Sequence, residues 1–181
     1  MFRPKIYPSP KKLPEQRLAC SVHFPCLLVR VKNLLKYVDP NSPKIYEDGI
    51  ISYALHQAAL KGQNNIVSVL IASGADSNLK QKDKNTTNSY HTPLHLAVRY
   101  EHLSTIGILL SNGADPNSPK TFDNGDITYA LHEAARKGQD KIVRVLIASG
   151  ADVNLKWRKT NSHATPLHLA VEHEHLKGNT R

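Results

Sequence analysis

Cysteine is scarce in this 181-residue chain, and its scarcity excludes a disulfide-stabilised fold. Only Cys20 and Cys26 occur, so neither a disulfide framework nor a paired CxxC motif is available. No run of 18 or more apolar residues is present, which excludes a transmembrane helix on length. The apolar segment 18–31 follows a basic stretch as in a signal peptide, but Pro25 and Arg30 interrupt it. We therefore expect an intracellular, cytoplasmic protein.

Acidic residues are outnumbered, with 15 Asp and Glu against 24 Lys and Arg, and the formal net charge is +9. Such a balance favours contact with nucleic acid, an anionic membrane surface or an acidic protein, and charge alone does not choose among them. The sequence also lacks a nucleophile elbow, a Walker-type loop and a dinucleotide fingerprint. We therefore expect no enzymatic activity and no cofactor.

A seven-residue motif built around Leu-His occurs four times and defines an internal repeat. Its copies lie at 53–59, 92–98, 129–135 and 165–171, so successive copies are 39, 37 and 36 residues apart. The tripeptide Gly-Ala-Asp follows each of the first three copies, at 74–76, 113–115 and 150–152. Self-similarity at such a period is the signature of a solenoid.

Each repeat has the pattern of two short helices. In the second copy, Thr92 is a suitable N-cap and Pro93 fits the first helical position. Apolar residues at helical spacing follow at 94–98 and again at 103–110. Gly113 then supplies a left-handed residue that can end the second helix.

The motif Thr-Pro-Leu-His-Leu-Ala at 92–97 and 165–170, with its Gly-Ala-Asp-x-Asn tails, resembles the ankyrin repeat family. The resemblance implies an all-α fold, an ankyrin-repeat α-solenoid with long hairpin-like loops between helix pairs. It further implies that partners bind the loop tips and the concave helix face. A structural role, tying one hairpin to the next through hydrogen bonds, is implied for four equivalent histidines: His56, His95, His132 and His168.

A longer period, two repeats in length, is superimposed on the single repeat, because Asp39–Lys44 recurs identically as Asp115–Lys120. Two unlike repeat types therefore alternate, and the N-terminal part becomes a degraded repeat of the second type. At the other end, the fourth repeat stops where its second helix should begin. We predict an extended or disordered basic, proline-rich segment at 1–17, a degenerate capping repeat at 18–41, ankyrin repeats at 49–78, 91–117 and 125–154, and a truncated repeat at 164–181.

A metal site is the strongest alternative use of the histidines. His168, Glu172 and His175 have i, i+4 and i+7 spacing on one helix. However, His168 occupies the structural position and His175 matches the turn residue His102 of the second repeat. A terminal helix also gives poor preorganisation, so we predict no metal ligands.

Two sets of positions do not contribute to the predicted core and are candidates for partner binding. The resemblance implies that one set, at the end of the first helix of each repeat, lines the concave groove. Arg and Tyr are enriched at interface hot spots, so these residue types lead that set. The other comprises the basic, aromatic loop tips, where the single tryptophan is either packed on the loop stem or offered to a partner. The candidate partner-binding residues are Tyr90, Arg99, Tyr100, Phe122, Arg136, Lys137, Trp157 and Arg158.

The resulting hypothesis is a non-enzymatic scaffold that binds another protein with an acidic surface. We expect a monomer that can associate through its incomplete C-terminal repeat and that does not bind membranes. Two alternatives stay open: a basic nucleic-acid-binding protein, although no nucleic-acid motif is recognised, and a non-functional remnant of a longer ankyrin array. Short arrays of this kind resemble ankyrin proteins of intracellular bacteria, some of which act inside a host cell.

Overall fold

The computed structural model describes residues 23–46, 51–82, 89–159 and 162–178. The segment 1–17, predicted to be extended, lies outside the described residues. Helices and two- or three-residue strands alternate along the chain in this order: α1 (His23–Leu34), β1 (Lys44–Ile45), β2 (Ile51–Ser52), α2 (Ala54–Leu60), α3 (Asn64–Ala72), β3 (Gln81–Lys82), β4 (Tyr90–His91), α4 (Pro93–Arg99), α5 (Leu103–Ser111), β5 (Lys120–Thr121), β6 (Ile127–Thr128), α6 (Ala130–Lys137), α7 (Asp140–Ala148), β7 (Trp157–Lys159), β8 (Ser162–Ala164) and α8 (Pro166–Gly178).

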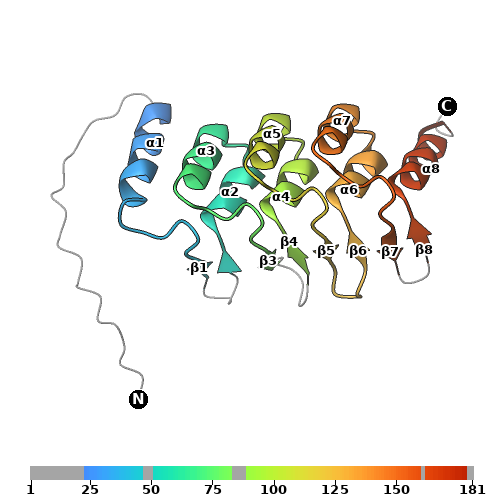
Figure 1. Ribbon diagram of the computed structural model, residues 1–181, viewed down its shortest axis with the longest axis horizontal. Helices are drawn as coiled ribbons and strands as arrows, with labels where there is room; N and C mark the ends of the chain where they lie inside the picture. The colour runs from blue at the N-terminus through green and yellow to red at the C-terminus, as the bar shows by residue number, and fades with distance from the viewer. Residues whose placement is uncertain (1–22, 47–50, 83–88, 160–161, 179–181) are drawn as a thin grey trace, which may run out of the picture.

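Helix pairs stack side by side into an elongated solenoid, with hairpins projecting along one edge (Figure 1). The first helices of the repeats, α2, α4, α6 and α8, form one row, and α1, α3, α5 and α7 form a second row packed against it. Each helix contacts its counterpart in the next repeat, so every repeat buries apolar surface only against its neighbours. The predicted helical repeat is confirmed.

The prediction of an all-α fold is wrong in one respect, because the hairpin stems form short antiparallel strands. β1 and β2 make a two-stranded sheet, and β3 to β8 make a six-stranded sheet in chain order. Consecutive hairpins pair as well, through Tyr90 with Thr121 and Ile127 with Arg158. The repeat spacing brings neighbouring stems within hydrogen-bonding distance, and backbone groups there satisfy one another.

The core is a continuous layer between the two helix rows. Small residues on the first helices let successive repeats approach closely, and larger residues on the second helices fill the space between them. The fully buried members are Ala59, Val67, Ala97, Val98, Ile106, Leu109, Ala134 and Leu146. All lie at the helical spacings that the sequence predicts to face the core.

The four equivalent histidines divide into two structural roles. His56 Nε2 donates to the carbonyl of His91 at 3.3 Å, and His132 Nε2 donates to that of Ala164 at 3.1 Å, so these two tie one repeat to the next. His95 and His168 instead close a capping box within their own repeat. For His95, the N–H of Thr92 donates to Nδ1 at 3.3 Å. Only this repeat type has a threonine three residues before the histidine, where the other type has tyrosine.

An asparagine ladder joins the loops that follow the second helices. The side chain of Asn78 donates to the Gly113 carbonyl at 2.9 Å and accepts from the Asp115 N–H at 2.7 Å. Asn41 bonds Gly74 and Asp76 in the same way, and Asn117 bonds Gly150 and Asp152. Each asparagine therefore binds the Gly-Ala-Asp turn of the next repeat.

The fourth repeat departs from the sequence expectation at its turn. His175 was expected in the turn after the first helix, but α8 runs on for 13 residues, where α2, α4 and α6 have 7, 7 and 8. Among the described residues no second helix packs against α8 to favour a turn there. The predicted segment boundaries remain predictions.

Candidate partner-binding groove

A groove of about 300 Å³ lies where α4 and α6 meet the hairpin strands of two successive repeats. It brings together Arg99, Phe122, Arg136 and Trp157, which the sequence placed in two separate sets. Its other lining residues are Lys120, Thr128, His132, Glu133 and Leu169. Residues from helices and loop stems of neighbouring repeats therefore share one concave site.

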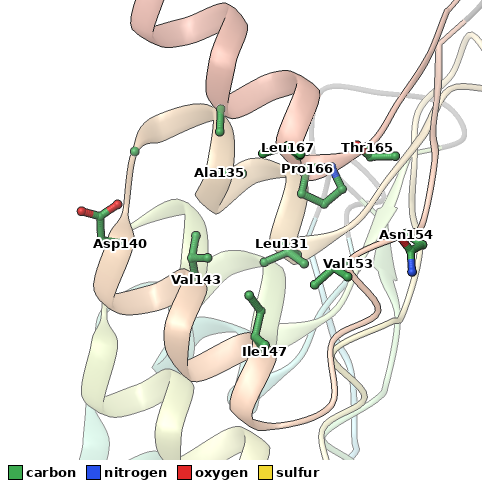
Figure 2. Close-up of a pocket in the computed structure, with 12 residues that line it drawn as sticks. Leu131, Ala135, Asp140, Val143, Ile147, Val153, Asn154, Thr165, Pro166 and Leu167 are labelled. Atoms are coloured by element: carbon green, nitrogen blue, oxygen red, sulfur yellow. The ribbon is translucent and has the colours of Figure 1, made fainter.

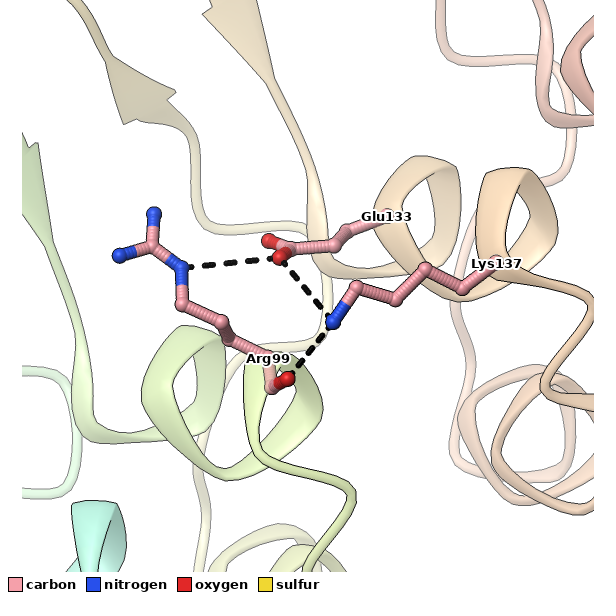
Figure 3. Close-up of polar contacts among 3 residues, drawn as sticks. All are labelled: Arg99, Glu133 and Lys137. Atoms are coloured by element: carbon pink, nitrogen blue, oxygen red, sulfur yellow. Dashed lines mark hydrogen bonds and ion pairs between the residues drawn. The ribbon is translucent and has the colours of Figure 1, made fainter.

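Arg99 and Lys137 are held by the same carboxylate. Glu133 Oε1 lies 3.6 Å from Arg99 Nε and 3.8 Å from Lys137 Nζ (Figure 3). Lys137 Nζ also donates to the Arg99 carbonyl at 2.6 Å, at the C-terminal end of α4, where a cation is favoured. Lys137 thus bridges two repeats, while the Arg99 guanidinium points away from its backbone beside Glu133.

Lys120 belongs to the groove although sequence reasoning did not select it. Its side chain is buried in β5, and its Nζ lies 4.9 Å from the centroid of the Phe122 ring, within cation–π range. Lys44 takes the same position over Tyr46, at 4.5 Å, in the hairpin two repeats earlier. The signal that could have found it is this repeated Lys-x-aromatic pattern on the hairpin stem.

The electrostatics of the groove favour an anionic ligand. Its cationic lining residues are Arg99, Lys120 and Arg136, and its acidic lining residue, Glu133, is already paired with Arg99, so the exposed Arg136 is the cation best placed for a ligand. Burial lowers the pKa of His132 from its ordinary value, so this imidazole is neutral at physiological pH. Phe122 and the half-buried Trp157 add apolar surface beside the cations.

Three further candidate residues do not line the groove. Tyr100 is exposed at the end of α4 and stacks on His102, with ring centroids 6.5 Å apart. Tyr90 is exposed on β4, and Arg158 is exposed on β7. Tyr90 and Arg158 lie on the six-stranded sheet, and Arg158 adjoins Trp157 in the sequence.

The family model for ankyrin repeats, in three copies, matches residues 26–120 and 120–178. These two segments cover most of the chain, and the helix pairs and hairpins described above account for the match. The chain belongs to the ankyrin repeat family. Ankyrin repeats generally mediate protein–protein interaction and are typically non-enzymatic modules.

The relatives to which the chain is similar are proteins of different kinds. The chain is 32% identical over 149 residues to the chicken nuclear factor NF-kappa-B p105 subunit, covering 81% of this chain and 14% of that protein. It is 31% identical over 121 residues to the tyrosine-protein kinase HTK16 of Hydra vulgaris, covering 67% and 14%. For mouse ankyrin repeat and SOCS box protein 5 the identity is 35% over 101 residues, covering 56% and 27%. The chain thus spans a small part of each relative.

The histidines of this ankyrin stack form no metal centre among the described side chains, where no group of three or more His, Cys, Asp or Glu could hold an ion. Of the set weighed in the sequence, His168 Nδ1 lies 2.7 Å from Thr165 Oγ1, and the His175 side chain lies outside the described residues. In the same part of the chain, no helix is long and apolar enough to cross a membrane.

Proposed function

We propose that the chain is an intracellular protein-interaction scaffold that binds an acidic segment of a partner protein on its concave face. Support comes from the groove that joins Arg99, Arg136 and Trp157 across two repeats. The exposed guanidinium of Arg136 suits a partner carboxylate, and the two aromatic rings of the groove suit an apolar side chain beside it.

Within this proposal the residues have different roles. Arg136 is exposed at the rim and forms no ion pair with a described residue, so it would pair with the partner carboxylate. Trp157 would supply the apolar anchor, because tryptophan is enriched among the few residues that dominate interface energies. Tyr90, Tyr100 and Arg158 would form the surrounding contact surface, and Lys137 would hold α4 and α6 at the required separation.

The test is affinity purification with mass spectrometry on three variants, followed by titration calorimetry on the partner that is found. Arg136→Glu and Trp157→Ala should each weaken binding on the order of 30-fold or more, as hot-spot residues do. Arg144→Glu is the matched control, since Arg144 is also an exposed arginine but lies on α7, in the other helix row.

Two results would sink the proposal. In one, Arg136→Glu and Trp157→Ala retain every partner at the affinity of the control. In the other, the unmodified chain binds duplex DNA or RNA tightly, with an affinity that falls steeply with salt, which is the behaviour of a nucleic-acid binder.

A further inference from the structure

The side chain of Arg99 is held in a closed ring of contacts with two charged residues of α6. Arg99 Nε lies 3.6 Å from Glu133 Oε1, and the same oxygen lies 3.8 Å from Lys137 Nζ. Lys137 Nζ in turn donates to the Arg99 carbonyl at 2.6 Å, which closes the ring (Figure 3). Because the ring includes both the backbone and the side chain of Arg99, it fixes the separation of α4 and α6 and the direction of the guanidinium together.

Glu133 contacts the guanidinium of Arg99 through Nε and leaves its other end available. The two terminal nitrogens point away from Glu133 (Figure 3), and neither has a hydrogen-bond or ion-pair partner elsewhere among the described residues. Arg99 lines the concave groove with 34% of its side chain exposed, whereas the Glu133 side chain is 12% exposed. A planar fork of N–H donors matches the two oxygens of a carboxylate. The carboxylate-binding end of Arg99 is therefore open to a ligand.

Glu133 has two opposing effects on an anionic ligand of the groove. Its charge repels the ligand, but its contact with Nε holds Arg99 in place before the ligand arrives. A free arginine side chain loses much of its conformational freedom on binding, so an arginine that is already fixed binds at a lower entropy cost. Because the two effects have opposite signs, the result of removing the Glu133 charge tells which of them is larger.

The duplicated block of two repeats provides an internal comparison. Its equivalents of Glu133, Arg136 and Trp157, 76 residues earlier, are Gln57, Leu60 and Gln81. Gln57 Nε2 donates to Ser52 Oγ at 2.8 Å, and Gln81 Oε1 accepts from the Tyr53 N–H at 3.2 Å. Both glutamines are thus engaged in neutral hydrogen bonds near the hairpin stems. The two blocks differ at the positions that the proposed binding site uses.

We propose that Glu133 is a positioning residue, which directs the fork of Arg99 so that Arg99 and Arg136 together bind the side-chain carboxylate of one Asp or Glu of the partner. This inference rests on the proposed function and makes its ligand more specific. The site distinguishes a carboxylate from a carboxamide of the same shape, because the amide nitrogen of Asn or Gln cannot accept a hydrogen bond from the fork.

The chain contains its own reporter of binding, because Trp157 is the single tryptophan and lines the groove. The probes are two blocked tripeptides, acetyl-Leu-Glu-Leu-amide and acetyl-Leu-Gln-Leu-amide, which differ only in carboxylate against carboxamide. Titration of the tryptophan fluorescence of the full chain, up to about 10 mM peptide, gives the two dissociation constants. The unmodified chain should prefer the glutamate peptide at least about tenfold.

Two variants test the positioning role. Glu133→Gln introduces the residue that the other block has at position 57, so the fold should tolerate it, which circular dichroism checks. Its preference for the glutamate peptide should fall about threefold or more, although the groove has lost a negative charge. Arg99→Lys keeps the positive charge but loses the fork, and it should lower the preference by a similar factor.

Asp140→Asn is the control for the removal of a negative charge. Asp140 is an exposed carboxylate at the start of α7, and it lines a separate groove of about 480 Å³ beside α7 and α8 (Figure 2). Its replacement should leave the preference for the glutamate peptide unchanged, because it does not contact Arg99.

The outcomes separate this inference from the proposed function. A preference that is unchanged or larger in Glu133→Gln would overturn the positioning role, because Glu133 would then only repel the ligand. An unchanged preference in Arg99→Lys would overturn the fork, since a point charge would be enough. In both cases the proposed function stands if Arg136→Glu abolishes the fluorescence response. An unmodified chain that responds to neither peptide would contradict the inference and the proposed groove together.

Discussion

The imidazole of His102 lies against Gly62 so closely that a β-carbon on residue 62 would fall 2.6 Å from its Nδ1. His102 Nε2 also donates to the Leu60 carbonyl at 3.0 Å, so the ring is fixed over the turn between α2 and α3. The contact joins two unlike repeats at the turns between their first and second helices. It accounts for the glycine at position 62, where the next repeat supplies a histidine.

Gly62→Ala should therefore destabilise the protein by about 2–4 kcal/mol, through the clash and the left-handed backbone, where φ is +63°. Urea unfolding followed by circular dichroism measures the loss. Gly74→Ala is the control. Gly74 has φ of +93° with open space around it, so an added β-carbon there costs only the strain of the left-handed backbone. Equal losses at the two positions would show that His102 moves away freely.

Glu101 occupies the same turn position as Gly62 and Gly138, with φ of +62°, and it is the non-glycine residue that the described chain holds in this conformation. Replacing it by glycine should raise the free energy of unfolding by about 1 kcal/mol, because a side chain in the left-handed region costs about that much. Thermal unfolding of Glu101→Gly checks the gain. A loss of stability would mean that the Glu101 side chain makes a compensating contact.

Much of this architecture follows from periodicity alone. The positions of Leu94, Ile106 and Leu109 in the core follow from helical spacing, because each repeat must bury one face against its neighbours. The short strands could not be predicted this way, because a strand of two residues, such as Tyr90–His91, is too short to show an alternating pattern. Their pairing depends on how hairpins of adjacent repeats align.

The groove was predictable in part, because helical periodicity also shows which residues do not face the core. Arg99, Arg136 and Trp157 stand at positions that the repeat leaves free of the core, and the stacking brings them together. The burial of Lys120 and the bridge from Lys137 to the Arg99 carbonyl depend on distances between repeats, which the spacing of residues in one repeat does not contain. The pattern predicts the turn at Glu101 and His102, but not the left-handed backbone of Glu101, because that conformation is typical of glycine.

Acid should unfold the protein over a range set by its buried histidines. Burial lowers the pKa of His56 to about 3, assisted by the neighbouring His91, and burial lowers the pKa of His95 to about 3, assisted by Lys120. Between pH 6.5 and about 3 the unfolded chain binds protons that the folded chain does not. Stability is therefore complete above pH 6.5 and falls on acidification, by about 1.4 kcal/mol per pH unit for each histidine.

His95→Gln isolates one of these contributions. Glutamine is a natural third residue of a capping box with Thr92, so the cap can persist without a titrating group. The slope of unfolding free energy against pH should decrease by about 1.4 kcal/mol per pH unit between pH 6 and 4 relative to the unmodified chain. An unchanged slope would show that His95 is protonated in the folded state.

The asparagine ladder gives a matched pair of substitutions. Asn78→Ala removes one hydrogen bond to the Gly113 carbonyl and one from the Asp115 N–H, and should cost about 1–3 kcal/mol in unfolding free energy. Asn154→Ala makes the same chemical change at the end of the series, where the amide has no described partner, and should cost less than about 0.5 kcal/mol in dilute solution. Chemical denaturation at low protein concentration compares the two. If both substitutions cost the same, the ladder stabilises each loop locally and does not couple adjacent repeats, because both asparagines are otherwise alike in sequence context.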